Sequence, residues 1–376
     1  MGNGTFWSNV VVSGVTPDLV AEIIRRSGKS TPLSIRGNLV TDRDADLKKI
    51  EYILRESNRI RLLDLEISTG NLRKLGAGEG MPKLEELRLT RIVGSGEGGD
   101  DDLLELGGLQ STRLKKITVD PIEVEDVRFL GYIRTPRLTQ ANFSILSKDD
   151  ETVLLGIVDL VAPIVNQAVK DNSLHACRFR ARDKYSLELD FARKMGDFDR
   201  SPNTPIIHLE FDNMQLKENF LPTIKDYLGE SLSAVRDLKV VDGEYTTGTR
   251  NDWTALFEQM PEVRTLRLHD RSARVVPSDF LGARDVPALL PKLESMIMRG
   301  STRRRLLRLF KHRDNARQLK YLTISDVADV TRGDLDSLAH IAHNISSDGV
   351  DIKLQVREEH SREGGGMSEK EGKQLC

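Results

Sequence analysis

The clearest copy of a phrase that recurs along this chain is MPKLEELRL, at positions 81–89. Its apolar residues Leu84, Leu87 and Leu89 follow the pattern apolar-x-x-apolar-x-apolar. Successive side chains of an extended chain point to opposite faces, so Leu87 and Leu89 would share one face and Arg88 would lie on the other. Similar lines return as MPEVRTLRL at 260–268 and LPKLESMIM at 290–298. A strand-sized unit that recurs in one chain predicts an array of repeats.

Ten copies of the phrase can be aligned along the 376 residues. Their apolar positions are Ile60/Leu63/Leu65, Leu84/Leu87/Leu89, Leu114/Ile117/Val119, Leu138/Ala141/Phe143, Leu174/Cys177/Phe179, Ile206/Leu209/Phe211, Val235/Leu238/Val240, Val263/Leu266/Leu268, Leu293/Met296/Met298 and Leu319/Leu322/Ile324. The first positions lie from 24 residues apart (Ile60 to Leu84) to 36 apart (Leu138 to Leu174), around the period of leucine-rich repeats. The segments 33–35 and 352–356 predict capping strands.

The segments between these copies read as helices. Thr16 is suited to an N-cap, Pro17 to the first turn and Gly28 to the stop of the first helix. Further helices are expected at 44–58, 151–170, 215–229, 252–259, 303–313 and 333–345. This alternation predicts an α/β leucine-rich-repeat solenoid of the ribonuclease-inhibitor type, with a parallel sheet on the concave face and helices on the convex face. The asparagine of regular repeats is missing, since Glu66, Thr90 and Asp120 stand in its place, so the repeats are irregular.

Composition narrows the class of protein. The net charge is −2, without the basic excess of a general nucleic-acid binder. Two cysteines exclude a disulfide scaffold. The longest apolar run, 153–165, is interrupted by Asp159 and Pro163 and is too short to span a bilayer. The first residues lack the basic and apolar regions of a secretory signal. We therefore expect a cytoplasmic or nuclear protein that does not bind membranes or a specific nucleic acid.

Three segments suggest a family: 6–12 (FWSNVVV), 17–35 and 53–65. They resemble fungal, basidiomycete-type F-box proteins with irregular leucine-rich repeats, in which the F-box ends in a phrase like Leu-Trp-Ser-x-Ile/Val. The resemblance implies the substrate-binding part of a cullin-type ubiquitin ligase. It also implies docking to a Skp-type adaptor, if an upstream F-box exists, because the adaptor-binding helices would precede Phe6. On this interpretation residues 1–14 are the remnant of the F-box, 15–357 are the solenoid and 358–376 are a disordered tail.

Few residues suggest a chemical site. Residues 94–99 match G-x-G-x-x-G after an expected strand, but three aspartates follow at 100–102 and would repel a phosphate, so a loop is favoured over nucleotide binding. Cys177 occupies an inward repeat position and is expected to be a buried, inert thiol. His340 and His343 are expected on a surface helix without a metal. We predict no catalytic, cofactor-binding or metal-binding residue.

A basic cluster occupies positions 302–313, TRRRLLRLFKHR. It could bind an acidic protein, serve as a nuclear address or contact nucleic acid. Leu306, Leu307, Leu309 and Phe310 give the segment an apolar face. The favoured interpretation is therefore a repeat helix with its basic side in water.

The outward positions of the repeats form the predicted binding surface. Arg, His and Tyr are common in interfaces, so the concave face is expected to bind a protein substrate or partner. The residues expected to contact that partner are Arg88, Asn142, Arg178, Arg180, His208, Glu210, Arg267, His269, Arg299 and Tyr321. The sequence therefore predicts a monomeric recognition module rather than an enzyme. The alternatives are a free-standing scaffold without a ligase link and an enzyme that binds a nucleotide through residues 94–99.

Overall fold

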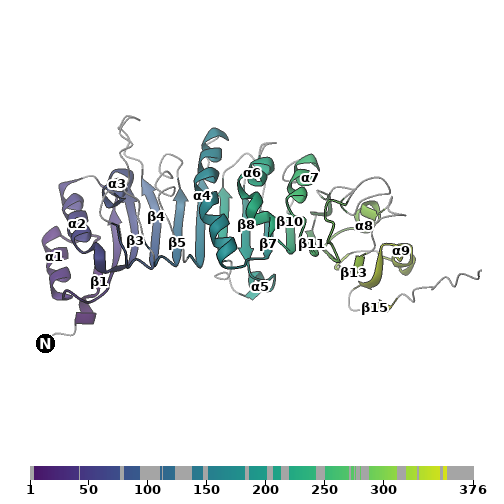
Figure 1. Cartoon of the computed structure of the whole chain (residues 1–376), viewed down its shortest axis with the longest axis horizontal. Coiled ribbons are helices and arrows are strands. Elements are labelled where there is room, and N and C mark those ends of the chain that lie inside the picture. Colours follow the sequence, from purple (N-terminus) through teal and green to yellow (C-terminus); the bar gives the residue numbers. More distant parts are fainter. Residues whose placement is uncertain are drawn as a thin grey trace, which may run out of the picture.

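Helices and strands alternate along the computed structural model of the chain (Figure 1). The structure describes residues 4–41, 43–76, 80–93, 111, 113–122, 138–146, 151–182, 186–200, 206–212, 220–242, 250–270, 272–274, 276, 280, 288–310, 319–327, 330–347 and 350–353.

The described helices are α1 (Pro17–Arg26), α2 (Asp44–Arg55), α3 (Thr69–Gly76), α4 (Glu151–Asp171), α5 (Asp197–Arg200), α6 (Phe220–Ser233), α7 (Arg250–Glu258), α8 (Arg303–Phe310) and α9 (Arg332–Ser337), with short 3₁₀ turns η1 (Gly4–Trp7), η2 (Ser57–Arg59) and η4 (Ser272–Arg274). Each of the seven expected helical segments overlaps one of the described helices, whereas α3 and α5 were not expected. The predicted cap of α1 is confirmed, because the Thr16 hydroxyl accepts a hydrogen bond from the Leu19 N–H at 3.3 Å. Gly28, just after this helix, has a φ of +76°, which favours glycine.

Ten of the fifteen described strands coincide with the repeated phrase. The fifteen strands are β1 (Asn9–Val11), β2 (Leu33–Leu39), β3 (Ile60–Ser68), β4 (Glu86–Val93), β5 (Lys116–Ile122), β6 (Gln140–Leu146), β7 (Ala176–Ala181), β8 (Leu187–Ala192), β9 (Ile207–Asp212), β10 (Asp237–Asp242), β11 (Thr265–Asp270), β12 (Ser295–Arg299), β13 (Leu319–Ser325), β14 (Ala342–Ser347) and β15 (Val350–Lys353). Each of the ten copies supplies one strand, and all of their apolar positions except Ile206 are buried. Residues 9–11, which we expected to precede the repeats, form the first strand.

Two expected elements differ at the C-terminal end. The helix expected at 333–345 ends at Ser337, and residues 342–347 form β14 instead, so His343 lies on a strand. Here pairing with β13 outweighs the local helical pattern, because Leu322 and Thr323 lie opposite Ile345 and Ser346. The capping strand expected at 352–356 is represented by Ile352 and Lys353 in β15, and its remaining residues lie outside the described part. The tail from 358 also lies outside it.

All the strands belong to one fifteen-stranded sheet, in the order β1-β2-β3-β4-β5-β6-β9-β8-β7-β10-β11-β12-β13-β14-β15. Most neighbours are parallel, but β7–β8, β8–β9 and β14–β15 are antiparallel. The copies therefore do not all stack in sequence order, since the order of the strands changes between β6 and β10. The chain leaves β6 through α4, enters the sheet at β7 and returns through β8 to β9, which pairs with β6. Cross-strand pairing of the acids on β8 with the arginines on β7 favours this hairpin.

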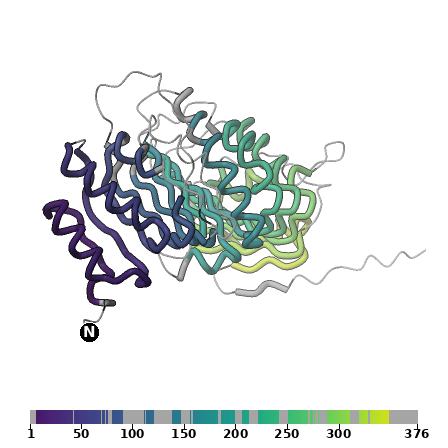
Figure 2. Tube along the Cα trace, turned by 60° about the vertical axis from the view of Figure 1, so that its left-hand side comes forward, coloured from purple at the N-terminus to yellow at the C-terminus, as the bar shows by residue number. Residues whose placement is uncertain are grey.

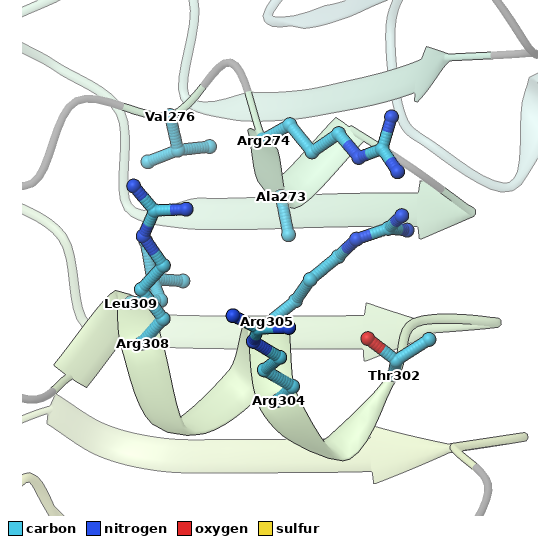
Figure 3. A pocket seen from close by; sticks show the side chains of 8 residues that line it. All are labelled: Ala273, Arg274, Val276, Thr302, Arg304, Arg305, Arg308 and Leu309. Carbon is cyan, nitrogen blue, oxygen red and sulfur yellow. The ribbon is translucent and has the colours of Figure 1, made fainter.

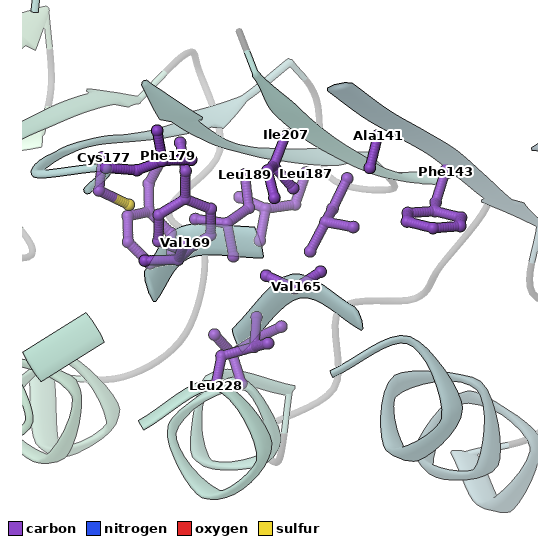
Figure 4. Packing of buried hydrophobic residues seen from close by; sticks show 14 of the residues in the cluster. Ala141, Phe143, Val165, Val169, Cys177, Phe179, Leu187, Leu189, Ile207 and Leu228 are labelled. Carbon is purple, nitrogen blue, oxygen red and sulfur yellow. The ribbon is translucent and has the colours of Figure 1, made fainter. Parts of the chain in front are cut away.

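The core lies between the sheet and a layer of helices on one of its faces (Figures 1 and 2). One continuous cluster of buried side chains extends from Val10 in β1 to Ile345 in β14. Figure 4 shows Val165 of α4 and Leu228 of α6 beneath Phe143, Leu189 and other inward residues of the central strands. Burial of such a side chain contributes about 1.5–3 kcal/mol. The protein is thus an α/β protein with a mostly parallel sheet and helices packed on one face. No described helix combines the length and the apolar character needed to cross a membrane.

Candidate partner-binding face

The sheet face opposite the helices carries one continuous row of side chains, set by the strand register. From β2 to β14 the row reads Arg36, Asp64, Arg88, Thr118, Asn142, His208, Asp190, Arg178, Lys239, Arg267, Ile297, Thr323 and Ser346. The inward neighbours of these residues join the core with α1–α4 and α6–α9. We call the face that carries this row the open face.

All ten residues predicted to contact a partner lie on the open face. Arg88, Asn142, His208, Arg178 and Arg267 belong to the row itself. Glu210, Arg180, His269 and Arg299 lie two positions further along their strands, and Tyr321 lies two positions before Thr323 on β13. Side chains two positions apart on a strand share a face. The structure therefore brings these residues onto one surface, although it spreads them from β4 to β13.

A group of charged residues occupies the centre of the open face, on β7, β8 and β9. We call it the charged cluster, and its members are Arg178, Arg180, Arg182, Glu188, Asp190, His208 and Glu210. The register places Asp190 between Arg178 and His208, and Glu188 between Arg180 and Glu210. The carboxylates of β8 are almost fully buried, with Asp190 0% and Glu188 1% exposed. Buried charges of this kind require partners.

Asp190 is the best-partnered member of the charged cluster. Arg178 donates to its Oδ2 from both Nε and Nη2 at 2.7 Å, and the Nδ1 atom of His208 lies 2.6 Å from its Oδ1. Because Asp190 is an acceptor when ionised, His208 is the donor in this contact. Glu188 contacts Arg180 at 3.5 Å and also Arg182, which donates to Glu210 at 2.8 Å. The cluster is a network of charge-assisted contacts across three strands.

A small apolar cap covers one side of the charged cluster. The segment that follows β8 folds over the open face, where Met195 and Phe198 pack on Ala176 and Ala192. The guanidinium of Arg178 lies 4.9 Å from the centre of the Phe198 ring. A cation over an aromatic ring is stabilised by the negative charge of the ring face. The cap therefore holds Arg178 in place and keeps water from Asp190.

His208 is the titratable group most affected by this arrangement. Burial by itself lowers the pKa of the imidazole, since it disfavours the charged form. The hydrogen bond to Asp190 and the negative charges of Asp190, Glu188 and Glu210 act in the opposite direction, and together they raise the pKa of His208 above its ordinary value. His208 therefore favours the protonated form more than a free histidine does.

The strands beyond the charged cluster present more accessible side chains. Tyr321 is 55% exposed, and Arg299 reaches Asp326 at 2.7 Å in an exposed ion pair. The buried Nε of Arg267 and the buried Oδ1 of Asn142 have no hydrogen-bond partner within the described part of the chain. Arg88, on the other flank, pairs with Glu86 of its own strand at 2.6 Å. The flank on β11–β13 thus offers donors and an aromatic ring to a binding partner.

The thiol, the possible metal ligands, the glycine-rich segment and the basic segment were considered above as candidate chemical sites, and the structure places them as follows. Cys177 is 0% exposed and points toward the helices (Figure 4), as expected. Burial, with a further effect from the Asp190 charge, raises the pKa of its thiol well above the ordinary value, although Arg178 acts in the opposite direction. No group of three potential metal ligands occurs among the described residues. The glycine-rich segment 94–99 lies outside them. Residues 303–310 of the basic segment form α8, and its residues beyond Phe310 also lie outside the described part of the chain.

Sequence reasoning missed Glu188 and Asp190 of the charged cluster because it missed β8. The strict alternation of apolar and acidic residues in LELDF, at 187–191, is the usual signal of a strand with one buried face. It lies outside the repeated phrase, so the search for repeats passed over it.

No model of a known protein family matches the chain, and a comparison with characterised proteins gives no match either.

Proposed function

We propose that this protein is a non-enzymatic recognition module that binds a protein partner on the open face of its sheet. On this proposal its repeated units form an irregular leucine-rich-repeat solenoid, in which the open face is the concave surface. The observation that carries the proposal is the continuous row of side chains, all polar except Ile297, that runs across the sheet on the face opposite the main helix layer. A sheet face that only the short segment around α5 covers, and that is lined by Arg, His, Asn and Tyr, is suited to an extended protein surface.

The charged cluster and the β11–β13 flank would have different tasks in such binding. The cluster satisfies its own charges, so it supports the shape of the surface and offers few free groups. The flank contains Arg267, Arg299 and the exposed Tyr321, and aromatic and arginine side chains contribute most strongly to interfaces. We therefore assign the main contacts to the flank.

By the resemblance to F-box proteins, the bound partner would be a substrate for degradation through a cullin-type ligase. A free-standing scaffold is the alternative. The two differ in the fate of the partner: its half-life in cells should lengthen when the protein is removed if the protein is a ligase receptor, and should stay the same if it is a scaffold.

Site-specific crosslinking tests the binding surface directly. A photoreactive amino acid replaces Tyr321 on the open face in one variant, and the exposed Lys48 on α2 in a matched control. Crosslinking in the native cells, followed by mass spectrometry, should give a protein adduct from position 321 and none from position 48. Equal adducts from both positions, or an adduct from position 48 alone, would exclude the open face as the binding surface.

Charge reversal then tests the assigned contacts with the captured partner. Arg267→Glu combined with Arg299→Glu should weaken binding by about a hundredfold, since interface arginines often contribute more than 1 kcal/mol each. Arg332→Glu on α9, on the other side of the sheet, is the control and should leave the affinity unchanged. Arg178 is not suitable for this test, because a glutamate there would lie beside the buried Asp190.

A further inference from the structure

A pocket with several arginine side chains lies between η4 and α8, on the side of the sheet that the helices cover (Figure 3). The cavity measures about 630 Å³. Its arginines are Arg274 from η4 and Arg304, Arg305 and Arg308 from α8. Cavities of about 300–1,000 Å³ are typical of sites for small ligands.

The two-faced sequence of α8 directs its arginines toward this pocket. Leu306, Leu309 and Phe310 are buried in the core, so the arginines around them remain on the outer side of the helix. Arg304 and Arg308 stand at positions i and i+4 and therefore share one helical face. Figure 3 shows Arg305 extending in the same direction as Arg274, which belongs to a different element.

Three of the four arginines of the pocket lack an ionic partner within the described part of the chain. No carboxylate occurs among the described residues that line the cavity, and Arg274, Arg304 and Arg308 take part in none of the salt bridges between described residues. Arg303 differs, because it donates to Asp334 at 2.7 and 2.8 Å. Like charges around one cavity repel one another, and a bound anion would remove that repulsion.

We propose that this pocket binds a small anion that carries two or more phosphate groups close together. A guanidinium group can donate two parallel hydrogen bonds to one phosphate, so arginines from η4 and α8 can hold neighbouring phosphates at once. Thr302 lines the pocket and stands immediately before α8. It adds a hydroxyl group beside the helix N-terminus, where backbone N–H groups and the helix dipole favour negative charge.

A nucleic acid fits these observations less well. Binding to a nucleic-acid backbone needs basic residues spread along several phosphates, whereas these arginines converge on one cavity. The chain as a whole also has a net charge of −2. The pocket and the open face lie on different sides of the sheet, so either proposal can fail without the other.

Calorimetric titration of the full chain with sodium tripolyphosphate tests the proposal, with orthophosphate as the single-phosphate comparison. Tripolyphosphate should bind at least about tenfold more tightly than orthophosphate, because it can engage more guanidinium groups. The double variant Arg304→Gln/Arg308→Gln should weaken tripolyphosphate binding by about tenfold or more. Both positions are exposed, so the fold should tolerate the change. Arg332→Gln, an exposed arginine on α9 outside the pocket, should bind like the wild type.

Two further measurements complete the test. Arg274→Gln changes the other wall of the pocket and should also weaken binding. Vesicles with a bisphosphorylated inositol lipid distinguish the source of the phosphates: co-sedimentation that the double variant abolishes identifies a lipid headgroup, and binding of tripolyphosphate alone identifies a soluble ligand. Absence of tripolyphosphate binding at millimolar concentration overturns the proposal, as does equal binding by the double variant. Binding of duplex DNA without binding of tripolyphosphate would also overturn it.

Discussion

Replacement of Asp190 by asparagine should destabilise the centre of the sheet strongly. Asp190 is 0% exposed and accepts two hydrogen bonds from Arg178 at 2.7 Å and one from His208 at 2.6 Å. Loss of one partner of a buried ion pair costs about 3–5 kcal/mol, because the other charge stays buried without compensation. The Arg178 side chain is 13% exposed and asparagine retains one acceptor oxygen, so we expect a loss of about 2–4 kcal/mol.

Tryptophan fluorescence during urea unfolding can measure this loss. Trp253 packs against Phe179 of β7, with ring centroids 5.8 Å apart, and therefore reports on the strands that carry the charged cluster. A Trp7→Phe background removes the signal of the second tryptophan of the chain. Hydrogen exchange of peptides that cover β7 to β9 measures local opening at the same place, which is useful because a long array need not unfold in one step.

Two control variants make the interpretation specific. Glu210→Gln changes a carboxylate whose contact with Arg182 is more exposed, and it should cost only about 0–1 kcal/mol. Asp190→Leu combined with Arg178→Met removes both charges, and it should cost less than Asp190→Asn alone. The reasoning about buried charge is wrong if Asp190→Asn unfolds at the same urea concentration as the wild type. It is also wrong if the double variant loses as much stability as the single variants Asp190→Leu and Arg178→Met lose together.

Three other predictions concern single residues. The raised pKa of His208 means that its contribution to stability is complete below its ordinary pKa of 6.5 and is lost as the pH rises through the raised value. The melting-temperature difference between wild type and His208→Gln should therefore shrink from pH 6 to pH 9, and a difference that grows over this range would contradict the assignment. Arg59→Met should cost about 2–4 kcal/mol in urea unfolding, because the buried guanidinium donates to carbonyl groups at the end of α1 and in the segment that follows it. An unchanged midpoint would refute this role. Gly37→Ala should destabilise the protein by about 1–3 kcal/mol, because a Cβ there would lie 2.5 Å from a hydroxyl oxygen. Gly156→Ala on α4 places its Cβ in open space, so it should be neutral or stabilising by up to about 1 kcal/mol. Equal melting temperatures for the two variants would count against this difference.

Local patterns predicted most of the elements but only part of the candidate site. The strands at the ten repeated phrases and the N-cap of α1 at Thr16 were predicted correctly, because alternation and capping depend only on neighbouring residues. The same alternation identified which side chains lie opposite the core, and all ten predicted residues lie on the open face. The helix expected at 333–345 was wrong beyond Ser337, since pairing with a neighbouring strand outweighed a weak helical pattern.

The sequence by itself determined the period of the strands, the helices between them and the polar character of the open face. Only the tertiary structure decided that β9, and not β7, lies beside β6. It also decided that Glu188 and Asp190 are buried on β8, between β9 and β7. The physical reason is the range of the interactions. Alternation and caps act over a few residues, whereas Asp190 is stabilised by Arg178 and His208, which are 12 and 18 positions away along the chain and become neighbours only after three strands have paired.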